Sequence, residues 1–372
     1  GTPSSNRCGF SSPIRCHIAW RYKTSGSSQP DTTEPKYPLH LVVMAIPASE
    51  LTAGVDYPRD RLELDTFFPD EASCLAYLER IRWRGGFGCP RCECEREPWR
   101  SSDGLLVCRE CQRRTSVLAG TIFHRTRSPL RNWFLAAWQI TSQKYGANAL
   151  GLQRDLGLKS YQTAWAWLHK FRRAMVRPDQ DRLQGIVEVD ESYVGGPEEG
   201  ASGRSTETKA IVAVAVEIVN EKRLGRVRLR PVADVTAGSL SSFVRDVVEP
   251  GTTVLTDGWS GYTNLNTLGY DHVVINQSAS PHSAHVLLPG PHRVASLVKR
   301  WLLGTYQGGV AKAQLPYYLD EFTFRFNRRT SRARGLLFYR LLEQAVATPY
   351  TGTADLYQDT GRGPSPRSHT RS

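Results

Sequence analysis

The stretch Ile186-Val-Glu-Val-Asp-Glu191 opens the half of the chain whose pattern decides the fold class. Its first four residues predict a β-strand, and the apolar run Ala210–Val216 predicts a buried one. Alternation over Arg226–Val232 predicts a third strand, and Thr253–Thr256 a short fourth. Helical spacing lies between and after these strands, at residues 239–248, 259–267, 292–303 and 315–328. Strands interleaved with helices predict a mixed α/β domain over residues 185–345.

Carboxylates gather at the ends of two of these strands. Glu188, Asp190 and Glu191 lie on the first strand or directly after it, and Asp257 ends the short one. Because side chains alternate along a strand, Glu188 shares the face of Asp190 while Glu191 points to the opposite face. Paired carboxylates on neighbouring strands suit a two-metal site for phosphoryl transfer. An Asp at the end of a strand is also a common turn or cap residue, so the pattern alone leaves both interpretations open.

Four cysteines in two C-x-x-C pairs predict a zinc ribbon over residues 87–115. The pairs are Cys89–Cys92 and Cys108–Cys111, with fifteen residues between the second and third cysteines. This spacing is typical of a zinc module, whose metal supplies folding energy that so short a segment lacks. Four thiolates leave no open coordination position, so the zinc is expected to be structural. Two disulfides are the alternative, which the absence of a secretion signal disfavours.

Arginines surround the four cysteines and favour contact with phosphate groups. They are Arg91, Arg96, Arg100, Arg109, Arg113 and Arg114, with Trp99 among them. A solvated positive surface, or a face for protein contact, is the alternative. Cys94 directly follows the first pair and breaks the symmetry of the module, so it is expected to bind no metal.

Residues 128–177 predict three helices that resemble a helix-turn-helix unit. Ser128-Pro129 is a start signal for the first, Leu150–Leu156 forms a short second, and Ser160 caps a third that runs to about Val176. In this interpretation the third helix enters the DNA major groove, with contacts from Ser160, Tyr161, Gln162, Thr163 and the later Lys and Arg residues. Any small three-helix bundle gives similar spacing.

Composition and the two ends of the chain give broader expectations. Lys and Arg total 48 against 36 Asp and Glu, and this net charge of +12 favours nucleic acid as partner over a membrane surface. No apolar run is long enough to span a membrane. Residues 1–43 are expected to be a disordered or non-native leader, and residues 44–86 an N-terminal helical segment with a helix over Glu71–Arg82. Residues 346–372 are expected to form a loose tail.

Several motifs resemble the signatures of ISXO-like insertion-sequence transposases. They are Val189-Asp-Glu-Ser-Tyr-Val-Gly-Gly196, Thr256-Asp-Gly-Trp-Ser-Gly-Tyr262 and Leu319-Asp-Glu-Phe-Thr-Phe-Arg-Phe-Asn-Arg-Arg329. The resemblance extends to Ala119-Gly-Thr-Ile-Phe-His124 and Trp301-Leu-Leu-Gly-Thr-Tyr306, so it spans roughly residues 65–345. It implies a ribonuclease H-like mixed sheet with flanking helices, here preceded by the zinc ribbon and the three-helix segment.

The same resemblance implies which residues are catalytic. Asp190 matches the first acid of the family and Asp257 the second. The third position is Glu in many members and Asn or His in others, with a Lys seven residues later. Ser296–Arg300 matches the segment that carries this Lys, so Lys299 is its counterpart and His292 falls at the third position. Thirty-four residues separate Asp257 from His292, a spacing familiar in this enzyme class.

A histidine at the third position changes the expected metal chemistry. The resemblance implies two Mg or Mn ions held by Asp190, Asp257 and His292, and manganese tolerates a nitrogen ligand better than magnesium does. His292 also suits the orientation of a water molecule or proton transfer. The alternative is an ordinary loop histidine, with the third site lost. Lys299 is expected to contact a DNA phosphate, and a solvated helix charge is its alternative.

The resemblance implies a transposase that binds double-stranded DNA at terminal inverted repeats. It would hydrolyse a phosphodiester there and join the freed 3′-hydroxyl to target DNA, as a homodimer or larger assembly. Arg325, Arg328 and Arg329 are expected to line the DNA path. A catalytically decayed or repurposed transposase that binds DNA is the alternative, and a zinc-ribbon transcription regulator is a third that the two aspartates disfavour. The expected location is the cytoplasm, at the prokaryotic nucleoid.

Overall fold

A computed structural model of the chain describes residues 47–176, 181–195, 209–220, 223–275 and 287–358. All of these residues belong to one compact unit, Leu39–Ser372. The predicted leader at residues 1–43 lies outside the described residues. In the described part of the chain, no helix is both long enough and apolar enough to cross a membrane.

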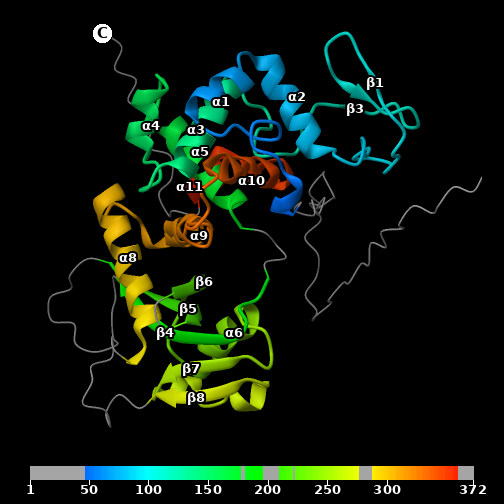
Figure 1. The fold of residues 1–372 in the computed structure, drawn as a ribbon. Coiled ribbons are helices and arrows are strands. Elements are labelled where there is room, and N and C mark those ends of the chain that lie inside the picture. Colours follow the sequence, from blue (N-terminus) through cyan, green and yellow to red (C-terminus); the bar gives the residue numbers. More distant parts are fainter. Residues whose placement is uncertain (1–46, 177–180, 196–208, 221–222, 276–286, 359–372) are drawn as a thin grey trace, which may run out of the picture. The chain divides into compact units, whose positions relative to one another are not determined.

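A five-stranded mixed sheet forms the centre of the second half of the chain (Figure 1). Its strands are β4 (Ile186–Val194), β5 (Ala210–Asn220), β6 (Arg223–Val232), β7 (Thr253–Asp257) and β8 (Asp271–Ile275). The spatial order is β6-β5-β4-β7-β8, with β5 antiparallel to both neighbours and the pairs β4–β7 and β7–β8 parallel. Because only the second strand in chain order is reversed, this is the arrangement of a ribonuclease H-like domain, and the predicted fold class is confirmed.

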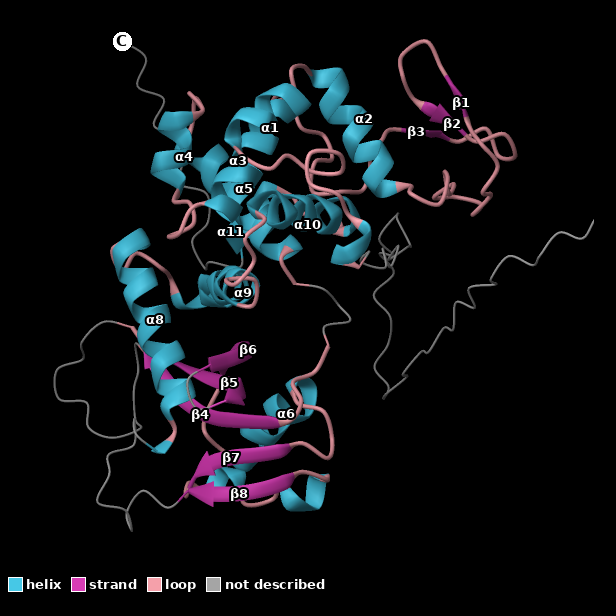
Figure 2. Ribbon diagram, in the orientation of Figure 1, coloured by secondary structure: helices cyan, strands magenta, loops and turns pink. Residues whose placement is uncertain are grey.

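Helices cover both faces of this sheet (Figure 2). On one face α6 (Ala237–Val247) packs on Ala213 and Ala215 of β5. On the other, α8 (Pro289–Tyr306) and α9 (Leu315–Phe326) pack on the alternate valines, Val212, Val214 and Val216. The continuous apolar sequence of β5 follows from this burial on both faces.

Helices from both ends of the described chain build a second hydrophobic core. They are α1 (Arg61–Phe67), α2 (Glu71–Arg82), α3 (Leu130–Ser142), α4 (Ala149–Asp155), α5 (Tyr161–Ala174) and α10 (Arg334–Ala347). Phe338 of α10 lies 5.8 Å, ring to ring, from Phe134 of α3. The predicted end of the catalytic domain at residue 345 is therefore wrong, because α10 returns to the helical core.

The predicted loose tail is also wrong over its first part. Thr353–Gln358 form the helix α11, in which Leu356 is 1% exposed. Tyr357 stacks on Trp165 of α5 at 4.7 Å between ring centroids. The Gly- and Pro-rich composition around these two anchoring side chains predicted a loose tail instead. Residues 359–372 lie outside the described part.

The predicted start signal of α3 acts differently in the structure. The helix begins at Leu130, after Pro129, and Ser128 provides no side-chain cap. Glu71 of α2 does so instead, since its carboxylate oxygens accept from the Leu130 N–H at 2.9 and 2.8 Å. A carboxylate suits this place because a helix N-terminus carries partial positive charge, and the contact joins α2 to α3.

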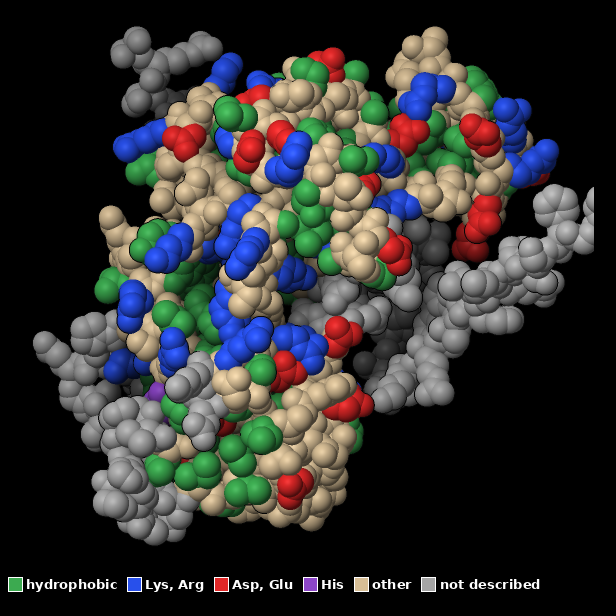
Figure 3. All heavy atoms as spheres, viewed as in Figure 1, with side chains coloured by type: hydrophobic (Ala, Val, Ile, Leu, Met, Phe, Trp, Pro, Cys, Tyr) green, Lys and Arg blue, Asp and Glu red, His purple; other side chains and the backbone are tan. Residues whose placement is uncertain are grey.

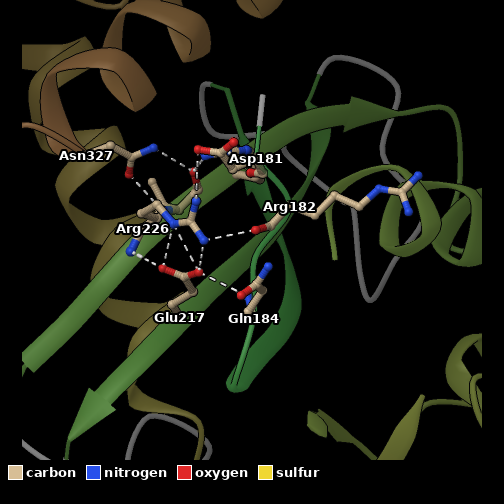
Figure 4. A network of polar contacts seen from close by, with 8 residues as sticks. Asp181, Arg182, Gln184, Glu217, Arg226 and Asn327 are labelled. Atoms are coloured by element: carbon tan, nitrogen blue, oxygen red, sulfur yellow. Dashed lines mark hydrogen bonds and ion pairs between the residues drawn. The ribbon is translucent and has the colours of Figure 1, made fainter. Parts of the chain in front are cut away.

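A polar network fixes the chain where it enters β4 (Figure 4). Glu217 of β5 accepts from the Gln184 N–H and the Arg226 N–H, both at 3.0 Å, and from the Arg226 guanidinium. Arg226 Nη2 also donates to the Arg182 carbonyl at 2.9 Å. Asn327, just after α9, pairs its amide with the N–H and carbonyl of Val227, at 2.8 and 3.1 Å. Edge strand β6 is thereby covered and the register at the start of β4 is fixed.

A buried ion pair joins the helical core to the sheet domain. Arg172 Nε of α5 lies 2.9 Å from Glu321 Oε2 of α9, and the two side chains are 1% and 0% exposed. The Tyr306 hydroxyl is 3.3 Å from both side chains, and the Arg172 guanidinium lies 4.1 Å from the Tyr318 ring centroid. Burial alone lowers the pKa of Arg172, but these tyrosines and Glu321 raise it overall. Arg172 therefore keeps its charge, and both side chains are fully enclosed.

The loop between α3 and α4 is held by the same two helices of the sheet domain. Trp301 Nε1 and Thr305 Oγ1 of α8 donate to the Tyr145 carbonyl at 2.9 and 3.1 Å. Arg325 of α9 donates to the Gln143 carbonyl at 2.6 Å. These contacts extend the junction around the buried ion pair.

Substitution of one member of this ion pair should destabilise the whole described chain. We expect Glu321→Gln to lower the free energy of unfolding by about 3–5 kcal/mol, because it leaves the Arg172 charge buried without a counter-charge. The double variant Arg172→Met with Glu321→Leu should lose much less, since it removes both charges. Chemical denaturation followed by circular dichroism measures both effects.

A matched control is Glu110→Gln, which breaks an exposed ion pair with Arg96 and should leave the midpoint almost unchanged. Equal losses in Glu321→Gln and Glu110→Gln would contradict the assigned role of the buried pair.

Candidate active site

Asp190 and Asp257 lie on neighbouring parallel strands. The register of β4 and β7 runs from Ile186 beside Thr253 to Glu188 beside Leu255. Two further residues along each strand bring Asp190 beside Asp257, and both side chains point to the face of Glu188 because the interval is even. Neighbouring strands are about 4.8 Å apart. The two carboxylates therefore adjoin where β7 ends, beside the middle of β4.

His292 comes to the same place from α8. It lies in the first turn of that helix, and its Nε2 is 3.5 Å from Asp190 Oδ2. The Asp190 side chain is 14% exposed and that of His292 39%, so the group opens to solvent on the His292 side. The structure thus places His292 beside Asp190, and Asp257 ends the strand that neighbours β4.

Glu188 fixes the start of α8. Its carboxylate, 5% exposed, accepts from the Gly290 N–H at 2.7 Å. A Cβ at Gly290 would lie only 2.7 Å from Glu188 Oε2 and 3.1 Å from Ile218 Cδ1, so a glycine is needed for this approach. Burial raises the pKa of Glu188, and the Gly290 hydrogen bond opposes the shift. Glu188 therefore acts as a positioning residue for His292, and the Pro289-Gly-Pro291 sequence is the signal that could have indicated it.

Glu191 points to the opposite face of β4, as strand alternation predicts. Its Oε2 accepts from the Tyr262 hydroxyl at 2.9 Å, and Tyr262 is fully buried in the core under α6. Burial raises the pKa of Tyr262, and the negative charges of Glu191, Asp190 and Asp257 raise it further. The Tyr262 hydroxyl is therefore a neutral donor within reach of the field of all three carboxylates.

Lys299 shares one face of α8 with His292. Seven residues in an α-helix turn through nearly two full turns and advance about 10 Å. Burial lowers the pKa of Lys299, and the positive charge of Lys209 lowers it further. Lys299 thus lies outside direct contact with the aspartates but on the same side of the helix.

The four cysteines form two knuckles with the same hydrogen bonds. The Cys89 N–H donates to the Cys94 carbonyl and the Cys108 N–H to the Arg113 carbonyl, each at 3.0 Å. Each knuckle ends in a left-handed residue, Glu93 with φ 58° and Gln112 with φ 55°. Three short strands, β1 (Trp99–Arg100), β2 (Leu106–Val107) and β3 (Arg114–Thr115), complete the ribbon.

The cysteine sulfurs fit a tetrahedral zinc ion. All four Sγ atoms lie within 4.8 Å of one another, with Cys89–Cys111 and Cys92–Cys108 at 3.6 Å. Zinc–sulfur bonds of about 2.3 Å require a separation of about 3.8 Å. A hydrogen bond from the Cys111 N–H is the main cause that lowers the pKa of Cys108 to about 6. Among the described residues, no other group of three or more candidate ligands meets so closely.

Two family models match the parts of the chain that hold these residues. Residues 182–327 match the ISXO2-like transposase domain and residues 69–114 match the transposase zinc-ribbon domain. The chain thus carries the two domains of an ISXO2-like transposase. It is also 29% identical over 276 residues to an uncharacterized protein in transposable element ISH50 of Halobacterium salinarum, covering 69% of this chain and 91% of that protein.

Two solved structures show a distant likeness to the transposase. The catalytic core domain of BIV integrase matches with 20% identity and a TM-score of 0.25, over 37% of this chain and 81% of that one. The Mos1 strand transfer complex matches with 14% identity and a TM-score of 0.25, over 61% and 78%.

The helix-turn-helix prediction for the transposase needs a correction. Lys170 and Arg172 were expected to read the groove, but they are 8% and 1% exposed. Lys170 Nζ donates to the Ile122 carbonyl at 3.4 Å, so its charge is used inside the protein. Only the N-terminal end of α5 faces solvent, where Tyr161 and Gln162 are exposed and Ser160 caps the helix.

The arginines at the end of α9 and directly after it also bind other parts of the chain. Arg325 holds the α3–α4 loop, and Arg329 Nη1 donates to the Gly225 carbonyl of β6 at 3.1 Å. Arg328 Nη1 donates to the Phe324 carbonyl at 3.0 Å. The expectation that these residues line a DNA path is therefore wrong for Arg325, whose side chain is 13% exposed.

Loss of one zinc ligand should unfold the ribbon of the transposase. We expect Cys92→Ser to remove about one zinc ion per chain, because the remaining three thiolates no longer complete a tetrahedral site. Elemental analysis of the purified protein and limited proteolysis across residues 87–115 measure the change. Cys94→Ser is the matched control and should keep its zinc; equal loss in both variants would contradict the assignment of ligands.

Substitutions at Glu188 and Gly290 should have non-additive effects on the free energy of unfolding. Gly290→Ala should lower the free energy of unfolding by about 1–3 kcal/mol, because the new methyl group displaces a buried carboxylate from its donor. Glu188→Gln keeps an acceptor and should cost less than Glu188→Ala. In a double-mutant cycle, Gly290→Ala should cost little in the Glu188→Ala background; additive losses would exclude the contact.

Proposed function

We propose that this transposase cleaves DNA at the ends of its element and joins the freed ends to target DNA. The observation that carries the proposal is the contact of His292 with Asp190, at 3.5 Å between Nε2 and Oδ2, beside the strand that ends in Asp257. Carboxylates at this edge of a ribonuclease H-like sheet are suited to hold divalent cations, which when bound supply electrostatic stabilisation for phosphoryl transfer. Asp190, Asp257 and His292 would hold those ions.

Each residue around the site then has a chemical role. Asp190 and Asp257 provide acceptor oxygens only, so they suit cations and repel the DNA phosphate unless cations intervene. His292 can accept or release a proton near neutral pH, at an atom beside Asp190. Glu188 keeps the start of α8 in place, and Lys299 offers a positive charge for a phosphate farther along the strand.

DNA binding is proposed for two surfaces. The exposed end of α5, with Tyr161 and Gln162, is suited to contact base edges. Lys and Arg side chains gather over α8, α9 and β6 (Figure 3). A cavity of about 700 Å³ there is lined by five arginines and three aspartates, namely Arg182, Arg226, Arg228, Arg230, Arg328, Asp181, Asp246 and Asp320. Because joining requires two DNA ends, we propose a homodimer or larger assembly as the working form.

A strand-transfer assay tests the proposal. The substrate is a labelled duplex with the inverted repeat that flanks the reading frame, incubated with Mg²⁺ or with Mn²⁺. Asp190→Asn and Asp257→Asn should each lower strand transfer by about 10³-fold or more, with little change in duplex binding. Strand transfer by Asp257→Asn at the wild-type rate would refute the assignment.

A decayed transposase that only binds DNA is the second candidate, and the histidine at position 292 favours it. The two are separated by His292→Glu. If the histidine is a ligand in a working site, wild-type protein should prefer Mn²⁺, and His292→Glu should raise activity with Mg²⁺. Duplex binding without strand transfer by either protein, in either metal, would support the decayed form.

A further inference from the structure

A second cavity lies along α8 from the candidate active site. It has a volume of about 400 Å³ and its walls come from β4, the start of β5, α8 and the segment before α9. Its lining includes Lys299, Leu302, Leu303, Val310, Lys312 and Leu315. This volume falls within the range of about 300–1,000 Å³ for small-ligand sites.

The cavity and the active site share one face of α8. Successive residues turn through about 100°, so His292, Lys299 and Leu303 lie within about 20° of one line along the helix. The rise of about 1.5 Å per residue puts Lys299 about 10 Å from His292. Stacked DNA advances about 3.4 Å per nucleotide, so this distance corresponds to about three nucleotides. A strand that passes the two aspartates would therefore reach the cavity within a few nucleotides.

The lining combines apolar walls with positive charge. Leu302 and Leu315 are buried, while Leu303 is 67% exposed at the mouth. No acidic residue is among the described lining residues. Within the described part of the chain, Lys299 and Lys312 form no ion pair, and burial lowers the pKa of Lys299. An occupant should therefore offer a flat or compact apolar group together with a negative charge.

We propose that this cavity receives one unstacked base of the DNA end, with its phosphate against Lys299 and Lys312; this inference rests on the proposed function. A base inside a duplex presents only its edges, so only an unstacked base can present its ring face to Leu303 and Val310. The cost of unstacking is a few kcal/mol, and it is lowest for an unpaired base. The site would then read the state of the DNA beside the cleaved bond rather than its sequence.

Fluorescence of 2-aminopurine tests this placement. Duplexes with the terminal repeat carry this base at single positions on either side of the bond to be cut, and the full-length protein binds them in EDTA. Stacking quenches the probe, and none of the described residues that line the cavity is aromatic. We expect emission to rise at one or two positions within about three nucleotides of the bond, and to stay at the duplex level elsewhere.

Variants at the mouth of the cavity test whether the rise in 2-aminopurine emission comes from a base bound there. Leu303→Ser with Lys312→Gln should return the emission to the duplex level and weaken binding of a duplex with one unpaired base about tenfold. Leu62→Ser, at a leucine of α1 that is 81% exposed, is the control and should keep the signal.

Three results would overturn the proposal. Tight duplex binding without a rise at any position would exclude an unstacked base, and a rise that survives the double variant would exclude this cavity. A protein that binds none of the duplexes would refute the proposed function, and this inference with it.

Discussion

The buried ion pair between Arg172 and Glu321 constrains the arrangement of the described chain. The two side chains are 1% and 0% exposed, so water cannot replace either partner of the pair. Helices α5 and α9 must therefore stay in contact whenever the chain is folded. Helix α9 packs on the sheet and α5 packs in the helical core, and the pair therefore couples the two cores. Tyr306 extends this coupling to α8, because its hydroxyl lies 3.3 Å from each member of the pair.

Helix α8 is consequently held at both ends by unlike contacts. Near its C-terminal end, Trp301 and Thr305 hydrogen-bond to the Tyr145 carbonyl of the helical core. At its N-terminal end, the Gly290 N–H is bound to Glu188 beside Asp190. A change in either core would therefore shift the helix that carries His292. DNA held at the exposed end of α5 and the proposed catalytic edge of the sheet would be connected through a rigid helix about 27 Å long.

The sequence indicated most of this where local pattern and spacing carry the information. Strand alternation assigned opposite faces to Glu188 and Glu191, and two C-x-x-C pairs marked the zinc ribbon. Predictions from the sequence were wrong for charged side chains whose partners lie far away in the chain. Arg172 meets Glu321 across 149 residues, and Arg325 holds a loop 182 residues away. From the local sequence alone, Arg172 and Arg325 were both predicted to be surface charges that contact DNA. The return of α10 to the helical core was missed for the same reason. The pattern of an amphipathic helix shows that one face is buried, but not which element covers it.

The histidine at position 292 also has an electrostatic consequence for the site without cations. Asp190 and Asp257 adjoin on the sheet, Glu188 lies on the same face, and Glu191 is close enough to influence the same tyrosine as the two aspartates. A carboxylate at position 292 would add another negative charge within 3.5 Å of Asp190, which raises carboxyl pKa values unless cations are bound. A neutral imidazole avoids that repulsion, and when protonated it forms an ion pair with Asp190. In the proposed site, a histidine at this position would weaken the attraction for Mg²⁺, because a neutral nitrogen would stand where a charged oxygen is preferred. Under the proposed function, a histidine at position 292 would thus make the chemistry more dependent on a metal that accepts nitrogen.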